Sequence, residues 1–288
     1  MSEKEVDDVS GVETTGHEWD GIKELNTPLP RWWLWTFYGT IVWALGYTIA
    51  YPAWPLISSA TSGVLGYSSR ANLDADVASA KVAQGDFVSK IEATPVAEIV
   101  ADEELARFAR AGGRSAFKVY CSQCHGTGAE GAAGYPNLND DEWIWGGTVD
   151  QIYATITHGV RSTADADTHF NEMPRFGIDG MLTPEQISAV AAQVASLSEI
   201  EGGVASEEGA LLFTENCAAC HGDTGGGIAE IGGPSLADPI WLYGGTLEEI
   251  AAQINKPKHG MMPAWSTKLG DPTIKQLAVY IHSLGGGQ

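Results

Sequence analysis

The chain has few basic residues, methionines and cysteines. Each shortage limits the partners or the cofactor ligands that the sequence allows. Its 288 residues include 16 Lys and Arg against 37 Asp and Glu, which gives a formal net charge of −21. This surplus of negative charge excludes nucleic acid as a partner, because the phosphates would be repelled. It favours a basic protein partner, whose association would be fast and sensitive to salt. The alternative is that the acidity only keeps the protein soluble.

The four cysteines all fall in two copies of one motif, so none is left for a disulfide. Each motif reads Cys-x-x-Cys-His, at residues 121–125 and 217–221. This string is typical of c-type haem attachment, in which two thioethers hold the porphyrin and the histidine binds the iron. One zinc site built from both cysteine pairs is the alternative, but the pairs are too far apart for a zinc ribbon. We therefore predict two covalently bound haem c groups, with these attachment and proximal residues: Cys121, Cys124, His125, Cys217, Cys220 and His221.

The sequence around the two motifs is repeated as well. Gly113 and Gly209 stand at the same distance before their motifs, and each is followed by a phenylalanine four residues later. A tryptophan and a Gly-Gly-Thr run follow each motif, within residues 143–148 and 241–246. A repeat of this length indicates duplicated domains. Each domain is small, so we expect a buried haem to supply much of its interior.

The methionine pattern predicts the second axial ligand of each iron. Met173 and Met262 each precede a proline at equivalent places in the two repeats. A thioether opposite histidine raises the haem potential, as in electron-carrying cytochromes. We predict that these methionines bind the irons, within each domain by default or exchanged between two facing domains. Met261 is a rival for Met262, and ligation by His158 or His259 is an alternative that would lower the potential.

A methionine-ligated iron has no open position for substrate, so we predict no catalytic residues and no oxygen or peroxide chemistry at these haems. A dihaem peroxidase is the alternative that needs an open or displaceable site. The first repeat also carries a longer segment before its methionine. There His169, with Asp165, Asp167 and Glu172, suggests a metal site, but a solvated loop is the favoured interpretation.

A long uncharged run near the N-terminus predicts one transmembrane helix. Residues 32–57 contain no charged side chain, and about 20 residues suffice to cross a bilayer. Tryptophan and tyrosine gather toward the two ends, as in interfacial belts. A cleaved signal peptide does not fit, because an acidic leader of residues 1–31 precedes the run. Lys23 and Arg31 before the run, against Arg70 after it, give a weak positive-inside bias. Attachment of c-type haem, which takes place outside the bacterial cytoplasm, is the stronger signal, and both predict a cytoplasmic N-terminus with the rest of the chain in the periplasm.

The remaining chain divides into an arm and two haem domains, and the fold class that we predict is all-α. Residues 58–100 form the periplasmic arm, 101–200 the first cytochrome c-like domain and 201–288 the second. A helix is expected over 101–120, where Gly112 and Gly113 permit close helix packing. The last helix of each domain is expected to open at Thr183-Pro184 and at Asp271-Pro272.

The N-terminal segment adds a resemblance to a known family. Residues 17–33 read His-Glu-Trp-Asp-Gly-Ile-Lys-Glu-Leu-Asn-Thr-Pro-Leu-Pro-Arg-Trp-Trp, and residues 51–55 read Tyr-Pro-Ala-Trp-Pro. Both, and the order of anchor, arm and two Cys-x-x-Cys-His and Met-Pro pairs, resemble the membrane-anchored dihaem subunit III of cbb3-type cytochrome c oxidases. The resemblance covers essentially the whole chain. A second spanning helix, present in some members of the family, is absent here.

The resemblance implies a non-catalytic electron-transfer subunit of an O2-reducing, proton-pumping oxidase of the bacterial inner membrane. Such a subunit accepts single electrons from a cytochrome c donor. It passes them to the monohaem subunit II and on to the haem–copper subunit I, and a small subunit IV is a further partner of such complexes. The alternative function is a free-standing, membrane-anchored dihaem cytochrome c that shuttles electrons.

Overall fold

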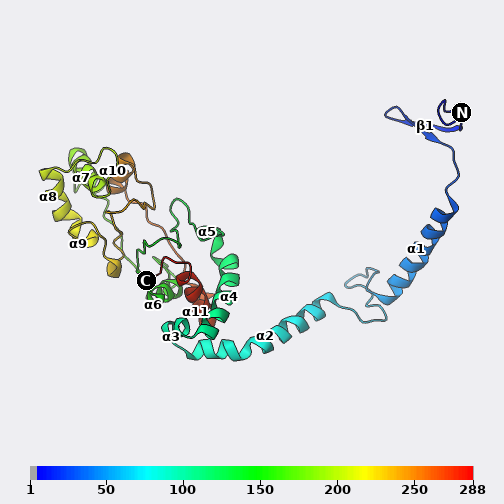
Figure 1. Ribbon diagram of the computed structural model, residues 1–288, viewed down its shortest axis with the longest axis horizontal. Coiled ribbons are helices and arrows are strands. Elements are labelled where there is room, and N and C mark those ends of the chain that lie inside the picture. The colour runs from blue at the N-terminus through cyan, green and yellow to red at the C-terminus, as the bar shows by residue number, and fades with distance from the viewer. Residues whose placement is uncertain (1–4, 288) are drawn as a thin grey trace. The chain divides into compact units, whose positions relative to one another are not determined.

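The structure is a computed structural model, and it describes residues 5–287 (Figure 1). The described part is mostly helical and contains one two-stranded sheet. The chain divides into two units, Met1–Val82 and Ala83–Gln288, and each is described by itself.

The N-terminal unit opens with a short β-hairpin that the all-α prediction missed. Strands β1 (Thr14–Trp19) and β2 (Ile22–Leu25) pair antiparallel, with Trp19 opposite Ile22. The turn residues Asp20 and Gly21 have φ angles of 50° and 82°. Asp-Gly with positive φ at both positions is typical of a tight hairpin turn. The all-α expectation is therefore wrong for this segment, while the other elements within residues 5–287 are helices.

Helix α1 (Arg31–Ala50) covers most of the predicted transmembrane run but ends before residue 57. The backbone turns extended at Tyr51, as expected for a residue that precedes a proline. None of the side chains of α1 is buried within the chain. Within residues 5–287, no helix meets the length and apolarity that a membrane crossing demands.

The predicted arm contains two helices. Helix α2 is Ser69–Ala93, and α3 (Val96–Ala101) follows it. Pro95 is the N-cap of α3 and separates the two, because a proline disfavours the helical conformation of the residue before it. Ile91 and Ile99 are fully buried in the C-terminal unit.

The C-terminal unit contains the two repeats, and three of its helices begin with a threonine capping box, whereas the helix that begins at Asp271 has Gly270 as its N-cap and no side-chain cap. Thr148, Thr183 and Thr246 each form a capping box with the third residue of the helix that follows. The predicted helix starts at Thr183 and Asp271 are confirmed. The helices of this unit are α4 (Glu103–Tyr120), α5 (Ser122–His125), α6 (Val149–His158), α7 (Pro184–Leu197), α8 (Glu207–Asn216), α9 (Ala218–His221), η1 (Ala229–Ile231), α10 (Leu247–Asn255), η2 (Trp265–Thr267) and α11 (Asp271–His282).

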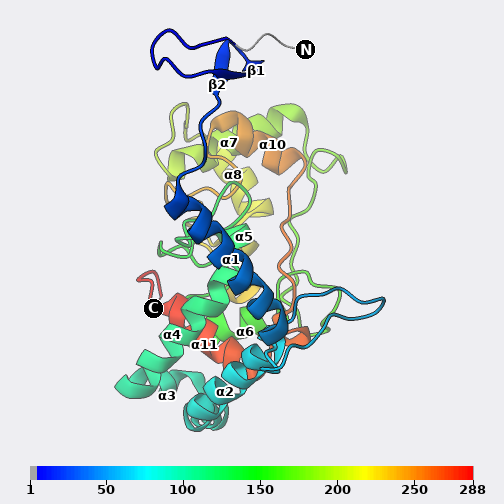
Figure 2. The same ribbon diagram turned by 90° about the vertical axis from the view of Figure 1, so that its right-hand side faces the viewer.

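Two hydrophobic cores lie in this unit, and each draws on both repeats. The first combines α3, α4 and α6 with the C-terminal helix α11, whose Leu277 is fully buried there. The second combines α7 of the first repeat with α8 and α10 of the second. Both views show α4, α6 and α11 together and α7, α8 and α10 in a separate group (Figure 1, Figure 2). The two repeats have thus exchanged their last helices.

Glycines allow the exchanged helices to cross closely. A Cβ atom on Gly113 of α4 would lie 2.0 Å from the Gln276 carbonyl oxygen of α11. A Cβ atom on the equivalent Gly209 of α8 would lie 2.7 Å from the Ala189 carbonyl oxygen of α7. The close packing predicted at Gly113 is confirmed, but its partner is the C-terminal helix of the other repeat.

Candidate haem sites

The first Cys-x-x-Cys-His motif lies where α4 ends and α5 begins. Cys121 is buried and Cys124 is exposed. His125 donates its Nδ1–H to the Pro136 carbonyl oxygen at 2.9 Å, which fixes the ring and leaves Nε2 for a metal. Burial lowers the pKa of His125, so the neutral imidazole that iron requires is favoured.

The second motif, at the junction of α8 and α9, has the same geometry. Cys217 is buried and Cys220 is half-buried. His221 donates its Nδ1–H to the Pro234 carbonyl oxygen at 2.9 Å, and burial lowers the pKa of this histidine as well. The sequence analysis missed Pro136 and Pro234, which fix the tautomer of each ligand. The signal was present, because each proline stands two residues after a glycine, in Gly134-Tyr135-Pro136 and Gly232-Gly233-Pro234.

All four cysteines are free of disulfides. Burial raises the pKa of Cys121 and of Cys217 to about 11, so each would be a protonated thiol at neutral pH. Within residues 5–287, no cysteine belongs to a cluster of three or more metal-binding side chains.

The two predicted methionine ligands lie in the cores of the opposite repeats. Met262 packs against the first core, which contains Cys121, and Met173 packs against the second, which contains Cys217. Met262 also exchanges two backbone hydrogen bonds of 2.9 Å with Val160 of the first repeat. Each methionine therefore accompanies the cysteine motif of the other repeat.

The rival ligands lie differently. Met261 is 65% exposed, whereas Met262 is half-buried against the first core. His158 pairs through Nδ1 with the Asp165 carboxylate at 3.1 Å, and His259 is exposed. His169, the histidine considered for a metal site, instead contacts the Thr155 hydroxyl through Nε2 at 3.2 Å and stacks on Trp145.

An orphaned indole supports the fit of a haem to the second motif. Trp143 donates its Nε1–H to the Gly286 carbonyl oxygen. The Nε1 of Trp241, at the equivalent position, is buried and has no partner in the protein. A buried donor of this kind costs free energy unless an acceptor satisfies it, and a haem carboxylate is such an acceptor. The free thiols, the oriented histidines and this indole all suit a covalently held porphyrin.

The loops of the two motifs also meet each other. The Gly134 amide donates to the Leu242 carbonyl oxygen at 2.8 Å, and a Cβ atom on Gly134 would lie 3.5 Å from the Tyr243 ring. On the other side, a Cβ atom on Gly232 would lie 2.3 Å from the Trp145 ring. Two haems at these motifs are therefore carried by one continuous unit.

Comparison with known proteins gives the same assignment for both parts of the chain. Residues 11–58 match the family described as the N-terminal domain of cytochrome oxidase-cbb3, FixP. Residues 109–193 and 204–281 match the family described as cytochrome c oxidase, cbb3-type, subunit III.

Similar proteins cover the chain almost end to end. The cbb3-type cytochrome c oxidase subunit FixP of Sinorhizobium medicae is 55% identical over 99% of this chain and 98% of its own length. Subunit FixPc of Rhizobium leguminosarum bv. viciae is 56% identical over the full length of both chains. Subunit CcoP of Cereibacter sphaeroides is 48% identical over 96% of this chain and 95% of its own. With two haem-attachment motifs of one geometry and matches along its whole length, the chain belongs to the subunit III family of cbb3-type cytochrome c oxidases.

Proposed function

We propose that this protein is the electron-relay subunit of a cbb3-type terminal oxidase. The observation that carries the proposal is the pair of identically built Cys-x-x-Cys-His sites in a chain that belongs to the subunit III family. Haem c supplies one-electron redox chemistry when bound. The chain attaches two such groups, orients their ligands and shields them from water.

Each attachment site has a defined set of residues in this proposal. The first haem is held by Cys121 and Cys124 with His125 as proximal ligand, and the second by Cys217 and Cys220 with His221. The core packing supports an exchanged set of distal ligands, with Met262 serving the first haem and Met173 the second. The exchange, one of the two arrangements that the sequence left open, ties both redox centres to one folded unit.

The partners are those of the oxidase complex. The subunit passes electrons from a cytochrome c donor to the monohaem subunit and then to the haem–copper subunit that reduces O2. The net charge of −21 suits a basic donor, because opposite charges steer the encounter. The chain itself makes and breaks no substrate bond, and a small subunit IV is a further candidate partner.

A membrane anchor at α1 is the second part of the proposal. The helix has 20 residues, its only charged residue is Arg31 at the start, and none of its side chains is buried in the chain. Tryptophan and tyrosine dominate its exposed surface, and both prefer the membrane interface. We place residues 1–31 in the cytoplasm, an anchor within 32–57, and the arm of 58–100 and haem repeats of 101–200 and 201–288 in the periplasm.

The test is purification of the tagged, full-length protein from bacterial membranes in mild detergent. Co-purified haem b and copper, with cyanide-sensitive oxygen uptake from reduced cytochrome c, are expected. A two-haem c-type spectrum without haem b, copper or uptake across several gentle detergents would overturn the proposal in favour of a free-standing shuttle. Carbonate extraction of the same membranes checks the anchor, which predicts that the protein stays in the pellet.

A further inference from the structure

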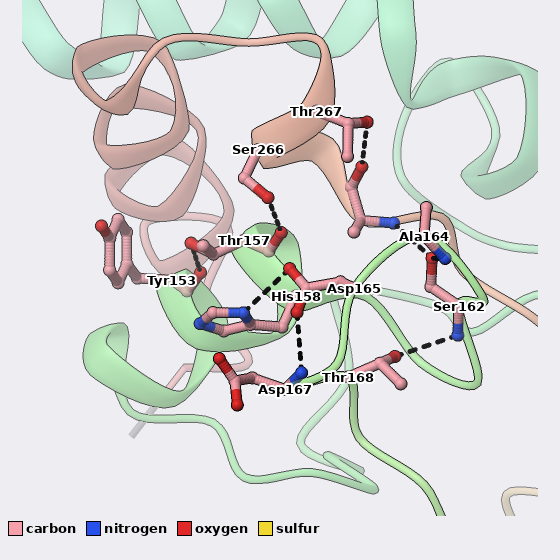
Figure 3. Close-up of polar contacts among 11 residues, drawn as sticks. Tyr153, Thr157, His158, Ser162, Ala164, Asp165, Asp167, Thr168, Ser266 and Thr267 are labelled. Carbon is pink, nitrogen blue, oxygen red and sulfur yellow. Dashed lines mark hydrogen bonds and ion pairs between the residues drawn. The ribbon is translucent and has the colours of Figure 1, made fainter.

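A polar cluster lies outside both haem sites, at the C-terminal end of α6 in the first repeat. It consists of His158, the last residue of the helix, with Asp165 and Asp167 from the insertion that follows. One ligand atom from each residue lies within 4.8 Å of the other two. Figure 3 shows both carboxylates next to the His158 ring. We propose that these three side chains bind a divalent transition-metal ion of the Zn²⁺ type.

The donor set determines the class of ion. Zn²⁺ accepts imidazole nitrogen and carboxylate oxygen as ligands, and three protein ligands leave its fourth position for water. A set with an imidazole favours Zn²⁺, Cu²⁺ or Ni²⁺ over Mg²⁺ and Ca²⁺, which prefer oxygen alone. Two carboxylates with a neutral imidazole also match the charge of a divalent cation.

The cluster is held in place by the surrounding backbone rather than by flexible side chains alone. The Nδ1 of His158 and the Oδ2 of Asp165 are 3.1 Å apart, and the Asp165 side chain is only 15% exposed. The Asp167 amide donates to the Oδ1 of Asp165 at 2.8 Å, which holds the Asp165 carboxylate beside the backbone of residue 167. Asp167 itself is exposed, so an ion has access from solvent.

The end of the helix also favours a cation at this place. The C-terminal end of a helix carries a partial negative charge, and His158 is in the last turn of α6. The neighbouring Arg161 donates its guanidinium hydrogens to the Gly260 and Asn171 carbonyl oxygens, at 2.7 and 2.9 Å. These hydrogen bonds hold the Arg161 guanidinium on carbonyl groups, and its positive charge counts against a cation nearby.

The site belongs to the first repeat alone. Residues 159–172 separate α6 from Met173, whereas only 256–261 separate α10 from Met262, and α10 ends in Asn255. The same insertion contacts the segment that carries Met262. Val160 forms backbone hydrogen bonds with Met262, and the Ser162 hydroxyl accepts a hydrogen bond from the Ala264 amide at 3.2 Å. A bound ion would therefore stabilise the segment that carries Met262.

Equilibrium dialysis of the full-length haem protein in detergent against Zn²⁺ tests the proposal, with bound metal counted per haem c. We expect one saturable Zn²⁺ per two haems, unaffected by excess Ca²⁺. Asp167→Asn should weaken binding by at least about tenfold, because it removes a ligand without breaking the His158–Asp165 pair. His158→Gln should have the same effect.

The matched controls are Asp150→Asn, at the other end of α6, and His259→Gln, both of which alter exposed residues outside the cluster. Both should bind Zn²⁺ as the unaltered protein does. Zn²⁺ should also raise the unfolding temperature of the unaltered protein and not that of Asp167→Asn. Absence of saturable Zn²⁺ binding, or equal affinity in Asp167→Asn, would refute the site. The haem spectrum of each variant shows separately that it is folded.

Discussion

At the scale of single residues, the site could be predicted largely because haem attachment is local in sequence. Cys121, Cys124 and His125 are consecutive or nearly so, and their roles follow from spacing alone. The distal ligand depends on which segments meet in space. Spacing favoured Met173 for the first haem by default, whereas packing favours Met262. A sequence repeat shows which residues are equivalent, but it does not show which repeat's methionine lies next to which haem motif.

The ligand exchange predicts the outcome of two matched substitutions. In a background in which Cys217 and Cys220 are alanine, only the first haem is attached. There Met262→Leu should abolish the near-infrared charge-transfer band of methionine-ligated ferric haem. The potential should also fall by a measurable part of the roughly 0.8 V that axial ligands span.

Leucine conserves volume, so little else should change in that variant. Met173→Leu in the same background is the control, and it should leave both band and potential near their original values. The opposite pattern, with the band lost only in Met173→Leu, would show ligation within each repeat.

At the scale of elements, the helices were predictable where caps and apolar spacing agree. Thr183 with Pro184 predicted the start of α7, and the structure has both hydrogen bonds of the capping box that Thr183 forms with Gln186. The hairpin β1–β2 was missed because its strands are short, and β2 is exposed throughout. Such strands lack the alternating apolar pattern by which strands are usually recognised, and only the Asp20-Gly21 turn remains as a signal.

The close crossing of α4 and α11 predicts that Gly113→Ala is strongly destabilising. The added methyl would lie 2.0 Å from the Gln276 carbonyl oxygen, and backbone cannot move aside as a side chain can. We expect a loss of about 1–3 kcal/mol in the free energy of unfolding, measured by denaturant titration of the haem protein.

Gly85→Ala in α2 is the matched control. Nothing lies within 4 Å of the added methyl there, so the change should be neutral or stabilising by up to about 1 kcal/mol. Equal destabilisation by both substitutions would contradict the crossing as the cause, because the methyl group added at Gly85 meets no neighbour.

At the scale of the whole molecule, the exchange of helices makes one unit out of two repeats. The sequence divides at about residue 200, but neither half contains a complete core, because α11 completes the first and α7 the second. Periodicity could reveal the number of domains and the helix positions. It could not reveal the pairing, because α7 and α11 present similar apolar faces and each fits either partner by pattern. Contacts between residues far apart in the sequence decide which last helix packs on which repeat, and a short stretch of sequence does not contain them.

This architecture predicts that a cavity-forming substitution in the last helix of one repeat lowers the local stability around the haem motif of the other repeat. Leu277 of α11 is fully buried in the first core, and Ile187 of α7 is 6% exposed in the second. Leu277→Ala should therefore lower the local stability around residues 121–125, and Ile187→Ala that around 217–221. Each loss should be about 2–5 kcal/mol, because a cavity replaces the side chain. Hydrogen–deuterium exchange of the haem-bearing peptides measures both effects in one experiment. In two independent tandem domains, Leu277→Ala would instead lower the stability at the second motif and Ile187→Ala that at the first. The exchange pattern therefore distinguishes repeats that have exchanged their last helices from two separate domains.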